Sequence, residues 1–130
     1  MGSVHTLEYS IDAQNWTQMT TATTITLANI NDKAYVRGIL SSNLTYSDCT
    51  KFAMTGKIAA SGNCNALWNY QDLEAPLKEY CGNSLFADCT SLTKAPDLSS
   101  TTLVPDCYCF MFKGCTGLTQ APALPSTTLA

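Results

Sequence analysis

The chain has 130 residues, enough for one ordinary domain or two small ones, and 45% of them are apolar, as in foldable globular proteins. Charged residues make up 13%, and the net charge is −3 at pH 7 with only seven Lys and Arg residues. This balance argues against a nucleic-acid-binding protein, because such a surface needs clustered basic side chains. No stretch approaches the roughly 18 apolar residues of a membrane span, and the N-terminus lacks the apolar core of a signal peptide.

Residues 4 to about 55 show the alternation of short β-strands. Leu7, Tyr9 and Ile11 alternate with polar residues, and similar patterns cover residues 24–27 and 34–40. We therefore predict a small all-β module over residues 1–55, as a sheet or sandwich. It would cap the repeat that follows, and its candidate contacts there are Phe52, Met54, Ile58 and Trp68.

The C-terminal half contains an internal repeat with a period of 26 residues. Residues 81–104 and 107–130 share 13 identical residues over 24 aligned positions, and the stretch CTSLTKAP at Cys89 returns as CTGLTQAP at Cys115. A decayed third copy is expected at residues 64–67, which have the same C-x-x-L frame as residues 89–92. Periods of about 20 to 50 residues are typical of solenoids.

Each copy is expected to form one coil of that solenoid. Pro96 and Pro122 exclude a continuous α-helix at the same point of both copies. One coil cannot bury its apolar face alone, so neighbouring coils would stack and share a core. The predicted core residues are Cys64, Leu67, Cys81, Phe86, Cys89, Leu92, Ala95, Leu98, Leu103, Cys107, Phe112, Cys115, Leu118 and Leu124.

The seven cysteines are an odd number, so they cannot all pair within the chain. No C-x-x-C element is present and there is a single histidine, so we predict no structural metal. We favour buried thiols over disulfides, because free Cys packs as a small apolar group. Cys109 aligns with Asn83 in the other copy and so has no cysteine counterpart, which makes it the best candidate for an exposed thiol. The other thiols would stack in two ladders, one of Cys64, Cys89 and Cys115 and one of Cys81 and Cys107.

The stretch LFADCTSLTKAPDL, together with CYCFMFKGCTGLTQAPALPSTTL, resembles the BspA-type leucine-rich repeats of surface proteins in gut Bacteroidetes. The likeness is close over residues 81–130 and loose over residues 56–80. It implies a right-handed leucine-rich-repeat solenoid. The expected fold is therefore the small N-terminal all-β module followed by this solenoid over residues 56–130, with about two and a half coils and, from the repeat register, a truncation at the C-terminus. The resemblance also implies a secreted or cell-surface protein linked with adhesion, and it carries no catalytic residues over.

The residues themselves offer little for catalysis. His5 is the only histidine, and it could serve Cys49 and Asp48 only if the N-terminus, which we expect to be flexible, held it in place. Asp72 and Glu74 could act as an acid–base pair, but solvated loop acids are far more common. We predict a protein that is not an enzyme, with no catalytic residue and no cofactor.

The candidate ligand surface consists of Trp68, Tyr70 and Tyr108, although the same aromatic residues could instead pack the first coil. We expect a surface-exposed binding or adhesion module that contacts a protein or glycan on a host or neighbouring cell. We also expect self-association through the uncapped C-terminal coil. The alternative is a structural spacer or assembly element of a larger surface structure or phage particle.

Overall fold

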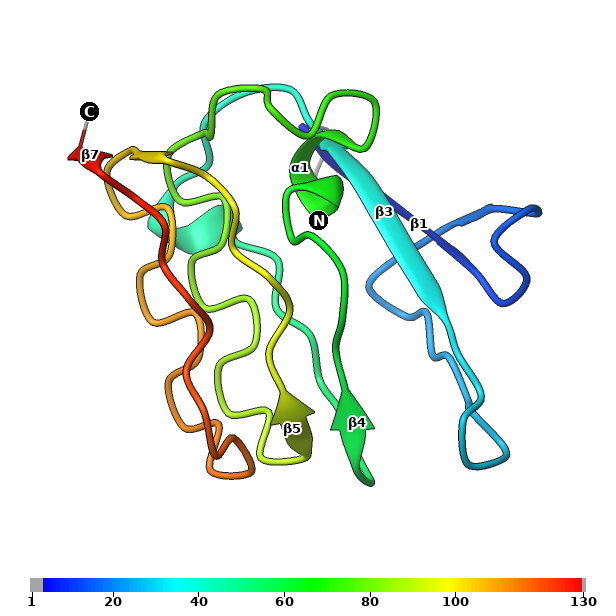
Figure 1. The fold of residues 1–130 in the computed structure, drawn as a ribbon. Helices are drawn as coiled ribbons and strands as arrows, with labels where there is room; N and C mark the ends of the chain where they lie inside the picture. Colours follow the sequence, from blue (N-terminus) through cyan, green and yellow to red (C-terminus); the bar gives the residue numbers. More distant parts are fainter. Residues whose placement is uncertain (1–3, 130) are drawn as a thin grey trace.

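The computed structural model describes residues 4–129 (Figure 1). Its elements in chain order are β1 (His5–Ser10), β2 (Thr17–Gln18), β3 (Tyr35–Leu40), the 3₁₀ turn η1 (Tyr46–Asp48), β4 (Ile58–Ala59), α1 (Ala66–Asn69), β5 (Leu92–Lys94), β6 (Thr102–Leu103) and β7 (Thr128–Leu129). Most of the remaining chain is turns and irregular backbone. Within residues 4–129, no helix is long and apolar enough to cross a membrane.

The N-terminal sheet is antiparallel, with the strand order β2-β1-β3. β1 pairs along its whole length with β3, from His5 opposite Leu40 to Ser10 opposite Tyr35. The alternation predicted strands at residues 7–11 and 34–40, and β1 and β3 confirm a strand in each stretch. The predicted buried face of the first is only partly right, because β1 ends at the buried Ser10 and Ile11 is 71% exposed. The strand predicted at residues 24–27 is wrong, because this stretch is a largely exposed loop without a ladder partner.

The predicted leucine-rich-repeat solenoid is also wrong. Instead of one continuous parallel sheet with a strand from every repeat, residues 4–129 hold three small separate sheets and one α-helix of four residues. β4 pairs with β5 and β6 pairs with β7, but residues 118–120, the counterpart of β5 in the second copy, form no strand. The nearby Pro96 and Pro122 have no N–H to donate, which keeps the paired segments short.

The two copies of the repeat nevertheless lie side by side. Each begins with a row of consecutive turns, the inner row (residues 78–89) and the outer row (residues 104–115), which Figure 1 shows as parallel zigzags in green and orange. In both rows, every second amide donates to the carbonyl three residues earlier. The donors are Cys81, Asn83, Leu85, Ala87 and Cys89 in the inner row and Cys107, Cys109, Met111, Lys113 and Cys115 in the outer row.

The amides between these donors join the two rows. In the inner row they belong to Tyr80, Gly82, Ser84, Phe86 and Asp88. Their N–H groups donate at 2.6 to 3.4 Å to the carbonyl oxygens of Pro105, Cys107, Cys109, Met111 and Lys113. The inner row therefore satisfies half of its donors internally and donates the other half to the outer row.

This zigzag requires left-handed backbone at every fourth residue. The φ angles are +59°, +57° and +63° at Tyr80, Ser84 and Asp88, and they are +53°, +53° and +73° at the matching positions Asp106, Phe110 and Gly114. Most of these residues carry a side chain, and left-handed backbone is unfavourable for them. The hydrogen bonds between the rows offset that cost.

Beneath the rows, the core is built from stacked rings and thiols. Phe52, Phe86 and Phe112 form a ladder with ring centroids 5.6 and 5.5 Å apart. The thiol of Cys89 donates to the Phe52 carbonyl at 3.2 Å, and that of Cys115 donates to the Phe86 carbonyl at 2.9 Å. Each cysteine thus links its own copy to the preceding segment.

The segment that precedes the inner copy is residues 44–64, which corrects the predicted third copy at residues 64–67. Ile58 pairs with Leu92, and the amide of Phe52 donates to Leu85. The amide of Cys64 donates to Asp97, so Cys64 lies beside the end of the inner copy and does not stack on Cys89. The register between these segments differs from the 26-residue period because residues 65–77, including α1, are inserted between them.

Helix α1 joins the N-terminal sheet to the rest of the molecule. Leu67 and Trp68 are buried, and the Trp68 indole Nε1–H donates to the Cys81 carbonyl at 2.9 Å. Gly38 on β3 lets the Leu67 carbonyl approach so closely that a Cβ atom at this position would collide with it. The sheet and the helix are therefore packed without room for an additional methyl group.

Candidate functional site

Among the residues that the structure describes, the outer row has backbone donors with no carbonyl acceptor on its far side. The N–H groups that match the inter-row donors of the inner row are those of Asp106, Tyr108, Phe110, Phe112 and Gly114. Within residues 4–129, none of them donates to a carbonyl. We call these five amides the donor edge. Unpaired donors in a row are a template for pairing with another chain.

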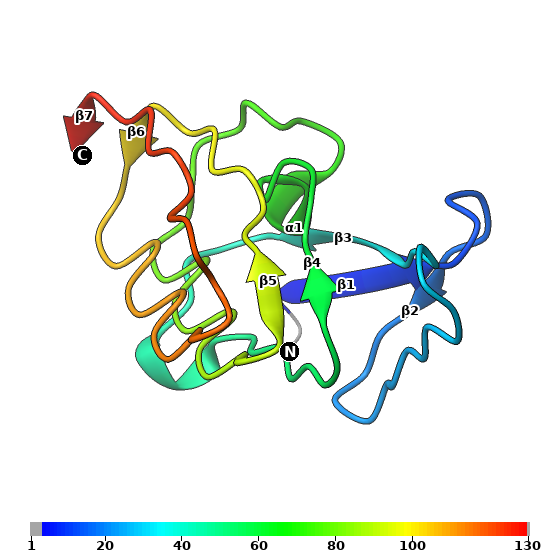
Figure 2. The ribbon, with the colours of Figure 1, turned by 60° about the horizontal axis from the view of Figure 1, so that its bottom comes forward.

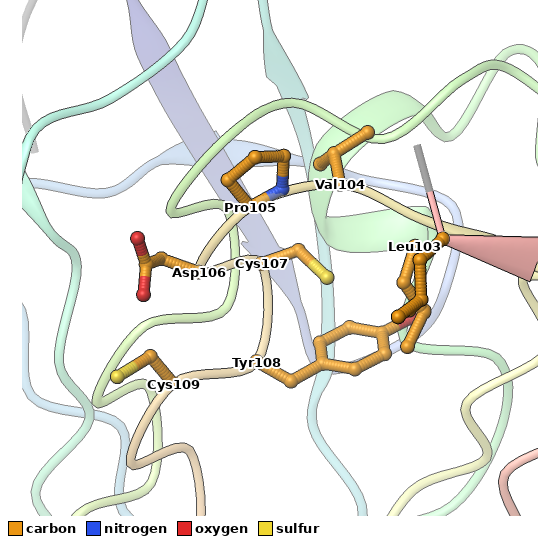
Figure 3. Close-up of a pocket in the computed structure, with 8 residues that line it drawn as sticks. Leu103, Val104, Pro105, Asp106, Cys107, Tyr108 and Cys109 are labelled. Atoms are coloured by element: carbon orange, nitrogen blue, oxygen red, sulfur yellow. The ribbon is translucent and has the colours of Figure 1, made fainter.

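A hollow of about 430 Å³ lies at one end of the donor edge (Figure 3). Its lining is mainly apolar and comes from β6, the start of the outer row and β7: Leu103, Val104, Pro105, Asp106, Cys107, Tyr108, Cys109 and Leu129. Figure 3 shows the ring of Tyr108 directed toward Leu103. The hollow can therefore receive apolar side chains next to the first donors of the edge.

The outer copy carries further exposed apolar side chains besides Leu129, which lines the hollow. Phe110 is 52% exposed, Leu124 is 60% exposed and Leu129 is 82% exposed. All three belong to the outer copy. Apolar groups clustered beside unpaired backbone donors mark a surface suited to contact with another protein.

Most predicted core residues are buried, namely Cys64, Leu67, Cys81, Phe86, Cys89, Leu92, Ala95, Leu98, Cys107 and Cys115. Leu103, Phe112 and Leu118 are half-buried. The assignment of Leu124 to the core is wrong, because this side chain is largely exposed. Its counterpart Leu98 is buried, since Leu98 lies in the inner copy, which has a described segment on each side.

The three aromatic residues of the predicted ligand surface do not lie together on the surface. Trp68 is 4% exposed and packs against Tyr108 with ring centroids 5.9 Å apart, so the packing alternative applies to it. Tyr108 is half-buried, with its hydroxyl enclosed, and burial raises the pKa of that hydroxyl. Tyr70 is half-buried and belongs to a different cluster.

That cluster centres on Arg37, which the sequence did not single out. The Arg37 guanidinium carbon lies 4.0 Å from the ring centroid of Trp16 and 4.1 Å from that of Tyr70. Its Nε–H donates to Glu8 Oε2 at 2.8 Å. Only the strand alternation hints at this arrangement, because it places Glu8 and Arg37 on polar positions of two neighbouring strands.

The thiols divide into two classes. Cys49 and Cys109 are half-buried, whereas the other five are buried, and residues 4–129 contain no disulfide. Burial raises the pKa of the Cys64 thiol to about 12. Burial also raises the pKa of Cys49, and the neighbouring Asp48 and Cys109 add to this effect. A raised pKa lowers the thiolate fraction, which makes Cys49 and Cys64 poor nucleophiles.

His5 has a structural role and is not at a flexible end. It is 1% exposed; its Nε2–H donates to the Leu67 carbonyl at 2.9 Å, and its Nδ1 lies 3.0 Å from the Thr50 hydroxyl. A carbonyl can only accept, so the neutral ring carries its proton on Nε2 and accepts from Thr50 at Nδ1. The Cys49 thiol donates to the Thr45 carbonyl. The imidazole and the thiol are thus occupied by other partners and do not form a nucleophile–base pair.

The acidic pair suggested by the sequence belongs to an exposed loop. Asp72 and Glu74 are exposed, and Asp72 Oδ1 accepts the Glu74 amide. Among the described residues, no group of three or more His, Cys, Asp or Glu side chains is placed to hold a metal ion. Comparison with known proteins found no family model, no curated relative and no solved structure that matches this chain.

Proposed function

We propose that the chain is a non-enzymatic binding module that contacts a protein partner through the donor edge and the hollow beside it. The observation that carries this proposal is the row of five unpaired amides on the outer row. The resemblance of the repeat motif to bacterial surface proteins supports display outside the cell or on a cell surface. The proposed partner contributes a segment of polypeptide chain.

The pairing of the inner row with the outer row shows what a partner must offer to the donor edge. Its amides at the same five positions bind carbonyl oxygens that lie two residues apart along the outer row. A partner segment must therefore offer carbonyl groups at alternate residues on one side, as an extended or turn-rich segment does. Main-chain hydrogen bonds would supply affinity, and the hollow would select the side chains.

The donor edge is better suited to bind a different protein than to bind the donor edge of a second copy of this chain. Two outer rows both present N–H groups, so they cannot satisfy each other by hydrogen bonding. Association of two donor edges with each other would depend on apolar contacts of Phe110, Leu124 and Leu129. The alternative role, an assembly element, requires that these contacts suffice.

A synthetic peptide with the sequence of residues 104–129 provides a direct test, because it carries the carbonyl pattern that the inner row already binds. We expect saturable binding to the reduced 130-residue chain by calorimetry. Binding should fail for a scrambled peptide of the same composition. Absence of binding by the native-sequence peptide would reject the proposal.

The matched variants are Phe110→Asp and Ile30→Asp. Phe110 has a positive φ, which Asp tolerates better than Phe does, so the fold should persist while a charge enters the binding surface. Ile30 is 93% exposed in a loop distant in sequence and serves as the control. We expect Phe110→Asp to weaken peptide binding at least about tenfold, the effect of removing an anchor side chain, and Ile30→Asp to leave it unchanged.

Sedimentation at several protein concentrations distinguishes the binding module from the alternative role as an assembly element. If the chain alone dimerises with increasing concentration, and Phe110→Asp abolishes this without any peptide binding by the native chain, the assembly role is favoured. A monomer that binds the peptide favours the binding module.

A further inference from the structure

The side chain of Arg37 is held on three sides by groups from three parts of the chain. Trp16 covers one face of the guanidinium and Tyr70 covers another, at 4.0 and 4.1 Å. Glu8 lies directly opposite Arg37 in the sheet and accepts the Nε proton. These contacts fix the rotamer of a side chain that is ordinarily mobile.

Both aromatic rings are themselves anchored. Trp16 follows a loop in which the Asp12 carboxylate accepts the amides of Gln14 and Asn15 and the Asn15 side chain. These hydrogen bonds hold the pKa of Asp12 well below its usual range. On the other side, the Tyr70 amide donates to the Gly38 carbonyl, next to Arg37 on β3. The position of each ring is therefore set by its backbone.

The Nη edge of Arg37 remains without a protein partner. Within residues 4–129, no hydrogen bond or ion pair is formed by Nη1 or Nη2. The side chain is still 27% exposed although its faces and its Nε are occupied. The four N–H bonds of the two Nη groups lie in one plane, and among the described residues none of them is used by a protein acceptor.

We propose that this edge is a binding site for a carboxylate group. Two parallel N–H bonds from a guanidinium match the two oxygens of a carboxylate, a geometry that an ammonium group cannot offer. The rims of Trp16 and Tyr70 add favourable electrostatics, because the edge of an aromatic ring is positive. Since the fork is already fixed, the ligand does not have to order it.

Glu8 sets the strength of this site. Its carboxylate neutralises part of the Arg37 charge, so the attraction between Arg37 and a ligand carboxylate is weaker. The site should consequently bind weakly and respond to salt. Replacing Glu8 by Gln keeps an oxygen for the Nε proton and removes the competing charge, which should tighten binding.

The site lies apart from the donor edge. β1 and β3 are at one end of the molecule and β7 is at the other, as Figures 1 and 2 both show. The carboxylate site does not depend on the proposed peptide contact, and either can fail without the other.

The two tryptophans make the test specific. D-glucuronate and N-acetylglycine are the probes, representing the carboxylate of a sugar and of a peptide end, with glucose and N-acetylglycinamide as their uncharged counterparts. We expect the Trp16 indole N–H resonance to shift with at least one acid and with neither neutral compound. The indole of Trp68 is buried and bonded to Cys81, so it should not move and serves as an internal reference.

Variants decide whether Arg37 is responsible. Arg37→Lys keeps the charge but loses the planar fork, and we expect it to reduce the affinity at least about tenfold. Glu8→Gln should increase affinity about threefold or more as the opposing charge is lost. No Trp16 shift with either acid, in both the native chain and Glu8→Gln, would overturn the site. Equal binding by native chain and Arg37→Lys would overturn it too.

Discussion

Leu92 and Leu118 occupy the same position of the two copies, and the sequence alone predicts a loss of stability of about 2–5 kcal/mol when either is changed to Ala. The structure separates them, because Leu92 is 0% exposed and Leu118 is half-buried. Leu→Ala removes three carbon atoms from the side chain. At about 0.8 kcal/mol per buried CH₂, the transfer contribution at Leu92 is about 2.4 kcal/mol.

A cavity adds to this loss. Leu92 lies between the β4 segment and the outer copy, so its surroundings cannot collapse freely, and the total loss should be about 3–5 kcal/mol. At Leu118 part of the side chain is already in water, and the space left behind opens to solvent. We expect Leu118→Ala to cost about 1–1.5 kcal/mol, since little transfer energy is lost there.

Urea unfolding of the reduced protein, followed by tryptophan fluorescence, measures both losses. The free energies are comparable if the slopes of the two transitions agree with that of the native chain. Equal losses for the two variants, within about 0.5 kcal/mol, the usual error of such comparisons, would refute the burial argument. A smaller loss at Leu92 than at Leu118 would refute it as well.

Three further predictions concern single residues. Burial lowers the pKa of His5 below its ordinary 6.5, so its contribution to stability is present above pH 6.5 and is lost as the pH falls through the lowered value. The urea midpoint, measured as a function of pH, should show this loss. His5→Gln should flatten the dependence of the midpoint on pH. Thiol titration of the native chain should find Cys49 and Cys109 reacting first, and rapid reaction of all seven cysteines would contradict their burial. Gly38→Ala places a methyl group against the Leu67 carbonyl, and a loss of about 1–3 kcal/mol is expected in the same urea assay.

The sequence located the strands that are half-buried and missed those that are not. β1 and β3 were found from their apolar alternation, although in β1 the burial departs from it at Ser10, which is buried, and beyond the strand at Ile11, which is exposed. β2 has two exposed residues and no pattern to detect. The stretch at residues 24–27 alternates equally well but is largely exposed and forms no strand.

The repeat predicted which residues lie side by side but not the backbone they adopt. Its 26-residue period matches the pairing of Thr102 with Thr128 and the stacking of Phe86 on Phe112. Turn rows with left-handed backbone at Tyr80, Ser84 and Asp106 carry no glycine signal, so the sequence could not reveal them. The solenoid inferred from the motif failed for this reason.

The candidate sites depend on contacts between distant parts of the chain. Trp16, Arg37 and Tyr70 are separated by 21 and 33 positions, and no spacing rule connects them. Phe52 and Ile58 were predicted as contacts of the repeat, and Phe52 packs against Phe86 while Ile58 pairs with Leu92. That their segment lies alongside the inner copy could not be predicted, because it retains only the apolar character of the repeat. Tyr70 was the one residue of the predicted ligand surface that the structure places beside a candidate binding group.

Amide hydrogen exchange resolved by residue tests the central claim, that the inner row is paired and the outer row is open. In the free chain we predict slow exchange at Gly82, Ser84, Phe86 and Asp88 and fast exchange at Tyr108, Phe110, Phe112 and Gly114. On addition of the 104–129 peptide, the second group should become slow. Fast exchange in the inner row, or no protection of the outer row at saturating peptide, would contradict the account.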